Sequence, residues 1–122
     1  MYSPQLLDHF ENPRNAGVLD SPDASAQLEN PVCGDVLALS ARISDGRIAG
    51  IRFKAKGCVP AMACGSALTT LVSGRTLAEA AEINTGAVTA VVGGLPQASS
   101  HAAHLAIDAL TLLLRNARNA EK

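Results

Sequence analysis

Two stretches of alternating apolar and polar residues, separated by an Asp-Gly pair, constrain the fold of this chain more than any other feature. The alternating apolar positions are Leu37, Leu39, Ala41 and Ile43 in the first stretch, and Ile51, Phe53 and Ala55 in the second. Asp45-Gly46 lies between them, and Asp-Gly is a preferred pair for the tight turn between two antiparallel strands. The pattern therefore predicts a β-hairpin with one buried face.

Two cysteines flank this predicted hairpin. Cys33 comes just before the first strand, and Cys58 follows the second. Because antiparallel pairing brings the open ends of a hairpin together, we expect Cys33 and Cys58 to be neighbours in space. Asp35 adds a carboxylate two positions after Cys33. Thiolates and carboxylates bind iron and zinc, so the joint arrangement indicates a metal site more than simple core packing.

The second cysteine also opens a predicted helix, which begins near Pro60 and ends near Gly74. Unpaired N–H groups at a helix start, together with the nearby Lys56, are expected to favour the thiolate form of Cys58. Cys64 lies nearly two helical turns further on and faces a different direction. A buried, inert thiol is the favoured interpretation of Cys64, and a reserve ligand or sulfur relay is the alternative.

Composition sets the class of protein in which these features occur. With 122 residues, 48% hydrophobic and 17% charged, the chain is expected to form one globular domain over 1–122. The net charge of -1 offers no basic field for nucleic acid or anionic lipid. No apolar run reaches the roughly 18 residues that span a bilayer, and the N-terminus lacks a signal-peptide pattern. We expect a cytoplasmic protein that binds neither nucleic acid nor membrane, with its three cysteines reduced.

The remaining segments are assigned from helix caps and from helix-breaking residues. The expected helices are 4–11, a short one opened by the capping box of Thr76 and Glu79, and a last one from Ser99 or Ser100 to about Asn119, whereas Gly17–Pro31 and 84–98 are expected to be a loop and a break.

Histidines are candidates for a further ligand. His101, His104 and Asp108 recur at helical spacing and share one face of the last helix. From the residues alone, a solvent-exposed stripe explains this pattern better than a metal ligand or proton carrier at His101. His9, in the first predicted helix, fits a surface position or a local cap.

Three segments taken together resemble the IscU/NifU/SufU-type iron–sulfur cluster scaffold family. They are Asp8–Gly17 with its Asn-Pro-Arg-Asn run, Cys33-Gly34-Asp35, and Phe53–Cys58, in that order. The extra segment that marks the SufU branch is missing, so the chain is more similar to the IscU and NifU N-terminal type. The resemblance covers nearly the whole chain and implies an α+β fold, in which a three-stranded antiparallel sheet is packed with helices.

The resemblance also implies a carrier function rather than an enzyme. Family members receive sulfur from a cysteine desulfurase, build a [2Fe–2S] cluster and pass it to apo iron–sulfur acceptor proteins, and they commonly bind zinc at the same site. The family's ligands map onto Cys33, Asp35 and Cys58, and its last-helix histidine maps onto His101. Two sulfurs, one oxygen and one nitrogen suit iron or zinc, or a cluster with mixed ligation.

One departure from the family falls beside His101. The family's third cysteine, which usually accepts sulfur from the desulfurase, is Ala102 here. In addition, Leu95–Ser99 only partly matches the segment that the family's Hsp70-type chaperone recognises. An assembly-deficient relative that binds zinc or iron is therefore the alternative function. Cys64 is a further candidate to compensate for Ala102, although its helical position argues against direct ligation. A hydrolase using Cys58 with His101 is a third hypothesis, but the sequence indicates neither an oxyanion site nor a substrate pocket.

Overall fold

The computed structural model describes residues 2–31 and 33–120. The ends of the expected domain, residues 1, 121 and 122, and residue 32 beside Cys33 lie outside the described residues. In chain order the elements are α1 (Pro4–Glu11), β1 (Ala24–Glu29), β2 (Val36–Ser44), β3 (Arg47–Lys56), α2 (Val59–Val72), α3 (Leu77–Ala81), α4 (Thr85–Val91), the 3₁₀ turn η1 (Gln97–Ser99) and α5 (Ser100–Ala120).

The strands form one antiparallel sheet in the order β1-β2-β3. Strands β2 and β3 are the predicted hairpin, and Ser44 pairs with Arg47 across the turn. Asp45 and Gly46 have φ values of 54° and 72°. Two successive positive values are typical of the type I′ turn, whose twist matches that of paired strands. The hairpin and the three-stranded antiparallel sheet are thus confirmed.

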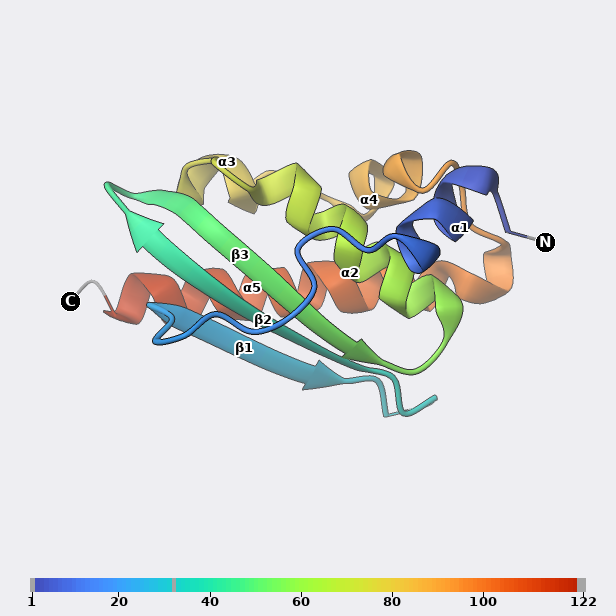
Figure 1. Cartoon of the computed structure of the whole chain (residues 1–122), viewed down its shortest axis with the longest axis horizontal. Coiled ribbons are helices and arrows are strands. Elements are labelled where there is room, and N and C mark those ends of the chain that lie inside the picture. Colours follow the sequence, from blue (N-terminus) through green and yellow to red (C-terminus); the bar gives the residue numbers. More distant parts are fainter. Residues whose placement is uncertain (1, 32, 121–122) are drawn as a thin grey trace.

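Helices α2 and α5 cover one face of this sheet (Figure 1). The covered face carries the apolar row predicted from the sequence, with Leu39 paired to Ala26 on one side and Phe53 on the other. Gly65 allows α2 to approach closely, because a Cβ there would lie 2.8 Å from Cδ2 of Phe53. This packing fixes the position of α2, and Cys58 sits at its N-terminus.

The segment between α1 and β1 lies along the free edge of β3 and then over the outer face of the sheet (Figure 1). The Gly17 N–H donates to the Phe53 carbonyl at 2.8 Å, and the Phe53 N–H donates to the Asn15 carbonyl at 2.9 Å. The Leu19 N–H then donates to Ser40 Oγ, at 3.0 Å, on β2. The edge strand β3 is therefore covered by the chain itself.

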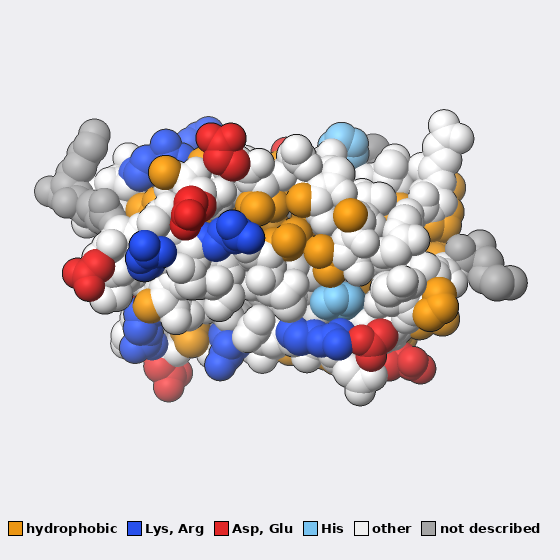
Figure 2. Space-filling view, turned by 90° about the horizontal axis from the view of Figure 1, so that it is seen from above, with side chains coloured by type: hydrophobic (Ala, Val, Ile, Leu, Met, Phe, Trp, Pro, Cys, Tyr) orange, Lys and Arg blue, Asp and Glu red, His pale blue; other side chains and the backbone are white. Residues whose placement is uncertain are grey.

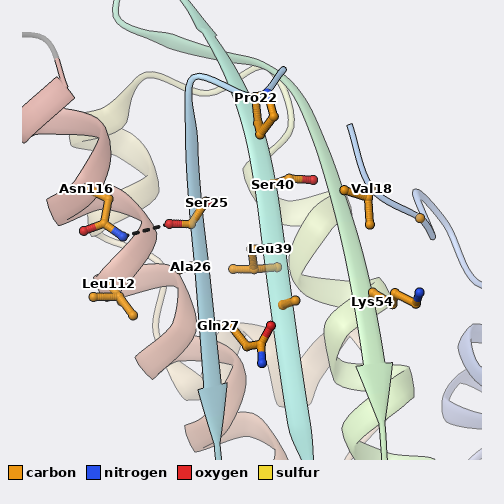
Figure 3. Close-up of a pocket in the computed structure, with 12 residues that line it drawn as sticks. Val18, Pro22, Ser25, Ala26, Gln27, Leu39, Ser40, Lys54, Leu112 and Asn116 are labelled. Carbon is orange, nitrogen blue, oxygen red and sulfur yellow. Dashed lines mark hydrogen bonds between the residues drawn. The ribbon is translucent and has the colours of Figure 1, made fainter. Parts of the chain in front are cut away.

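A pocket of about 510 Å³ opens on this outer face, between the segment and the strands (Figure 3). Its floor carries small side chains, among them Ser25 and Ser40, and Val18 stands at its rim. At the edge of the pocket formed by α5, the side-chain amide of Asn116 donates to the backbone carbonyl of Ser25 at 2.7 Å. This hydrogen bond holds the helix against strand β1.

Two expectations about irregular segments were wrong. Strand β1 lies inside the expected loop Gly17–Pro31, where Ala24 and Ala26 are buried in alternation with Ser25. These small residues give a weak strand signal, and the sheet supplies their burial. Helix α4 lies inside the expected break 84–98; Asn84 caps it by accepting the Ala87 N–H at 2.9 Å. The capping box of Thr76 and Glu79 and the expected helix 4–11 are confirmed.

Acidic and basic side chains are intermingled on the face seen in Figure 2, with hydrophobic side chains gathered near its middle. Among the described residues, no helix combines the length and the apolar character that crossing a membrane requires.

Candidate metal centre

Asp35 is the centre of the site, and its side chain is only 3% exposed. Its Oδ1 accepts the backbone N–H of Cys58 at 2.9 Å. Its Oδ2 accepts hydrogen bonds from two thiols, Cys58 at 3.1 Å and Cys33 at 3.3 Å. One carboxylate oxygen thus lies between the two sulfur atoms, whose separation cannot exceed the sum of these two lengths. The structure brings Cys33 and Cys58 together at the open end of the hairpin.

A tight loop presents Cys33. The Asn30 N–H donates to the Asp35 carbonyl at 2.7 Å, and the Gly34 N–H donates to the Asn30 carbonyl at 2.7 Å. Gly34 has a φ of 73°, a left-handed conformation that glycine adopts without strain. The loop leaves Cys33 exposed to solvent while its sulfur contacts the buried carboxylate.

Cys58 reaches the same carboxylate from the start of α2, where it is the N-cap residue. Gly57 precedes it with a φ of 141°. A Cβ at Gly57 would overlap Oδ1 of Asp35. Glycine at this position therefore makes room for the carboxylate and permits the backbone turn that places Cys58 against it.

His101 enters from the first turn of α5. Its Nε2 lies 3.4 Å from Oδ2 of Asp35 and 3.8 Å from Sγ of Cys58. Its Nδ1 lies 3.2 Å from the Ala98 carbonyl, which can only accept, so Nδ1 donates. In a neutral imidazole the lone pair is then on Nε2, facing the thiol and carboxylate. Such a second hydrogen bond is the usual way in which a metal-ligating histidine is oriented.

The expected solvent-exposed stripe on α5 is therefore wrong for His101 and holds for the other two residues. His104 and Asp108 are exposed, whereas His101 is half-buried and turned toward Asp35. The difference arises from η1, which places the Ala98 carbonyl against the imidazole.

Together the site offers the donor types that iron and zinc bind. One ligand atom each from Cys33, Asp35 and His101 lie within 4.8 Å of one another, and the Cys58 sulfur contacts the Asp35 oxygen and the His101 nitrogen. Soft sulfur with imidazole nitrogen and one carboxylate oxygen suits iron or zinc rather than magnesium or calcium. The donor set therefore fits the predicted metal.

The protonation of the thiols differs from the sequence-based expectation. Burial, followed by the hydrogen bond to Asp35, raises the pKa of the Cys58 thiol, although the Ala61 N–H acts in the opposite direction. The expected preference of Cys58 for the thiolate form is thus wrong, because burial and then the neighbouring Asp35 carboxylate both favour the neutral thiol. Burial also acts to raise the pKa of Asp35, but hydrogen bonds from Cys58 and Cys33 outweigh it and lower that pKa. A bound cation would reverse this preference and draw the thiol protons off.

Cys64 and Ala102 both lie in the hydrophobic core. Cys64 is 0% exposed, and burial, followed by the charge of Cys58, raises the pKa of its thiol to about 12. The expected burial of the Cys64 thiol is confirmed, and its inertness stays a prediction. Ala102 is 1% exposed, so the side chain next to His101 packs in the core.

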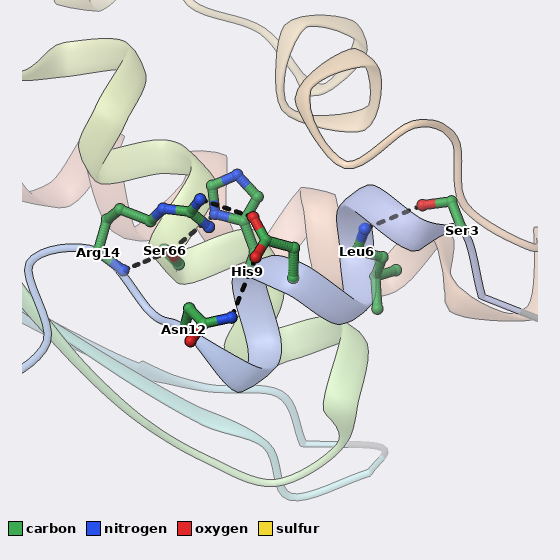
Figure 4. Close-up of polar contacts among 7 residues, drawn as sticks. Ser3, Leu6, His9, Asn12, Arg14 and Ser66 are labelled. Atoms are coloured by element: carbon green, nitrogen blue, oxygen red, sulfur yellow. Dashed lines mark hydrogen bonds and ion pairs between the residues drawn. The ribbon is translucent and has the colours of Figure 1, made fainter.

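His9 is buried, which overturns its expected surface or capping position. Its Nδ1 lies 2.8 Å from Ser66 Oγ, and the Arg14 N–H donates to the same oxygen at 2.9 Å (Figure 4). Burial, followed by the charge of Arg14, lowers the pKa of His9. The partner lies 57 positions away in sequence, so no local pattern could have indicated it. The contact joins α1 to α2 rather than serving the metal centre.

Sequence reasoning missed two positions that shape the site. Gly57 makes room for Asp35, and the Ala98 carbonyl orients His101. A glycine directly before a candidate ligand was the available signal for Gly57. A backbone carbonyl leaves no mark in the residue type, so Ala98 had none.

Comparison with known proteins identifies the family of this chain. Residues 1–120 match the family described as NifU-like N terminal domain. The chain is 42% identical over 110 residues to iron-sulfur cluster assembly scaffold protein IscU 1 of Archaeoglobus fulgidus, covering 90% of this chain and 72% of that protein. It is 36% identical over 126 residues to iron sulfur cluster assembly protein 1, mitochondrial, of Eremothecium gossypii, covering 99% and 81%.

The fold comparison agrees. The crystal structure of a nitrogen-fixing NifU-like protein (N-terminal) from Brucella abortus superposes with a TM-score of 0.77 at 21% identity, covering 96% of this chain and 94% of the other. That likeness concerns the fold alone, and the sequence match carries the relationship. The chain belongs to the family of NifU-like N-terminal domains.

Proposed function

We propose that this protein is a scaffold for iron–sulfur cluster assembly. It holds iron or a [2Fe–2S] cluster through Cys33, Asp35, Cys58 and His101 and passes this cargo to apo-proteins. The observation that carries the proposal is the convergence of two thiols on one buried carboxylate oxygen, with a histidine nitrogen beside them. The names of the relatives support the same function, and they support a carrier rather than an enzyme.

Each donor has a distinct role in this proposal. The sulfurs of Cys33 and Cys58 supply the strong, soft ligands that iron–sulfur clusters require. His101 and Asp35 complete the coordination with nitrogen and oxygen, which hold cluster iron less tightly than a thiolate does and so favour release. The exposed position of Cys33 leaves the cargo open to an acceptor protein. Sulfur would come from a cysteine desulfurase, the partner class expected of this family.

Anaerobic reconstitution tests the proposal. The protein is incubated with ferric iron and inorganic sulfide, and visible absorption and metal content are recorded. We expect charge-transfer bands in the wild type and their loss in Cys33→Ala and Cys58→Ala. Cys64→Ser is the matched control, because its thiol is fully buried, and it should keep the bands. Colour that persists in both alanine variants would reject the assigned site.

A zinc- or iron-binding relative without assembly activity is the second candidate function. The buried Ala102 supplies no ligand atom beside His101. The remaining donors are the compact set of Cys33, Asp35 and His101, together with Cys58. Four such donors can bind a single ion in tetrahedral geometry, which favours this function. In the same reconstitution, stoichiometric zinc with no colour would identify this function.

A further inference from the structure

We propose that the free edge of strand β1 is a docking site for an extended, basic segment of a partner protein, which adds to the three-stranded sheet as a further strand. The inference rests on the proposed function, because a scaffold has to meet the proteins with which it exchanges its cargo. It names the surface at which such a protein binds, and the chemistry of the segment that the surface recognises.

The two edges of the sheet differ in how their backbone groups are used. At the β3 edge, both backbone groups of Phe53 are bonded to the covering segment, through Asn15 and Gly17. Strand β1 forms the opposite edge (Figure 1). Among the described residues, the hydrogen bond made at this edge is the one from the Asn116 side chain to the Ser25 carbonyl. An uncovered strand edge is a template for pairing with another chain.

The backbone groups of Gln27 and Glu29 face this open edge. In a strand, the backbone groups of every second residue point to the same side. The Ser25 carbonyl points away from β2, toward Asn116, so the backbone groups of Gln27 and Glu29 point away from β2 as well. Both residues are exposed, and within the part of the chain that the structure describes their outward backbone groups have no partner. An added strand could bond to the N–H and the carbonyl of each.

A groove of about 500 Å³ lies beside this edge, between the end of β1 and the first turns of α5. Leu28 and Leu105 contribute apolar surface to it, and His101 lines it as well. Because His101 also contacts Asp35 in the metal centre, the groove ends at the candidate cargo site. A segment paired with β1 would therefore bring the adjoining part of its own protein next to the cargo.

The charge of the groove favours a basic occupant. Glu29 and Asp108 both line it and both are exposed, whereas none of its described lining residues is Lys or Arg. Neither carboxylate takes part in an ion pair between described residues. Opposite charges across an interface speed association and select among partners. A second copy of this chain would bring the same carboxylates to the same edge, and like charges on paired strands are unfavourable.

Peptide titration of the metal-free protein, followed by NMR, tests the proposal. The probe is a capped hexapeptide of alternating lysine and valine, and a capped hexapeptide of alternating glutamate and valine is the matched control. We expect the lysine peptide to shift the amide signals of Gln27 and Glu29 and to protect them from hydrogen exchange. The amide of Leu28, which points toward β2, should gain no protection. Added salt should weaken the binding.

Two substitutions at Gln27 separate the backbone from the side chain. Gln27→Pro removes the outward N–H and leaves the bonds to β2 intact, a position at which edge strands tolerate proline. We expect it to weaken peptide binding about tenfold, since one hydrogen bond is lost and the ring obstructs the added strand. Gln27→Thr keeps the N–H and should bind as the wild type does. Circular dichroism checks that Gln27→Pro is folded, and the wild-type amide signals test the proposal without any variant.

Three outcomes would overturn the proposal. They are wild-type amide shifts that spare both Gln27 and Glu29, equal binding of the lysine and glutamate peptides, and a dimer of the free protein that Gln27→Pro abolishes. The last of these would make a second copy the occupant of the edge. None of them touches the proposed function, because reconstitution with iron and sulfide needs no partner and Gln27→Pro should keep the visible bands. A wild type that forms no cluster but binds the lysine peptide at β1 would reject the proposed function and leave the docking site standing.

Discussion

At the scale of single residues, the site depends on the carboxylate of Asp35, which is buried and hydrogen-bonded through both of its oxygens. Asp35 accepts from the Cys58 backbone, the Cys58 thiol and the Cys33 thiol. Leaving such a group buried without partners would cost several kcal/mol, of order 1–3 or more for a charged group. The bonds offset this cost and hold both sulfurs in position. Gly57 is part of the same arrangement, since any side chain there would collide with Asp35.

Replacement of Gly57 by alanine should therefore damage the metal centre while leaving the rest of the fold in place. The new Cβ would displace Asp35 Oδ1, and the φ of 141° is strained for alanine. By analogy with loss of a positioning contact around a metal ligand, we expect metal affinity to fall roughly 10- to 100-fold. Competition between the protein and a coloured chelator for Zn²⁺ measures the change.

Gly50→Ala, in the strand β3 that precedes Gly57, is the control. The nearest atom to a Cβ at Gly50 is Cβ of Arg42 at 4.0 Å, so this substitution should leave affinity unchanged. Equal affinities for the two variants would show that Gly57 does not position the carboxylate.

At the scale of elements, strong local patterns could be predicted and weak ones could not. The hairpin β2–β3 carries a clear alternation and an Asp-Gly turn, and it alone was enough to place Cys33 beside Cys58. Strand β1 is built from Ala, Ser and Gln, so its pairing with β2 and its packing against α5 decide its conformation. The orientation of His101 likewise depends on η1, a single turn with no sequence signature.

The contact between α1 and α2 should make stability depend on pH through His9. Its folded-state pKa lies below the ordinary value of 6.5, so the unfolded chain takes up a proton at a higher pH than the folded protein does. The contribution of neutral His9 is complete above pH 6.5 and declines as pH falls below it. At neutral pH, His9→Gln should lower the free energy of unfolding by about 1–3 kcal/mol, the cost of a buried partner left unsatisfied.

Urea denaturation on either side of that pH checks the prediction. The difference in free energy of unfolding between the wild type and His9→Gln should become smaller in the more acidic buffer. His104→Gln, at an exposed position of α5, serves as the control and should change little. A gap of constant size would mean that His9 does not titrate in this range.

At the scale of the whole molecule, the site joins three parts of the chain that are distant in sequence. The loop before β2 supplies Cys33 and Asp35, the start of α2 supplies Cys58, and the start of α5 supplies His101. An ion bound there links all three, and it binds the native state only. Binding should therefore stabilise the fold.

Thermal unfolding with and without metal measures this linkage. At a free metal concentration of about 100 times Kd, binding contributes about 2.7 kcal/mol, which corresponds to a rise in Tm on the order of 10 °C for a domain of this size. A chelator should remove the rise, and a Cys33→Ala/Cys58→Ala variant should not show it. A wild-type Tm that changes with neither metal nor chelator would contradict the prediction that metal binding stabilises the fold.

The single oxygen of Asp35 shared by two thiols has a consequence for how cargo is handed over. The thiols of Cys33 and Cys58 both donate a hydrogen bond to that oxygen. Only the deprotonated sulfurs bind metal. Binding of the cargo must therefore release the thiol protons, and release of the cargo must return them. Delivery is therefore coupled to proton uptake, and mildly acidic surroundings at a docked recipient would pull the exchange toward discharge.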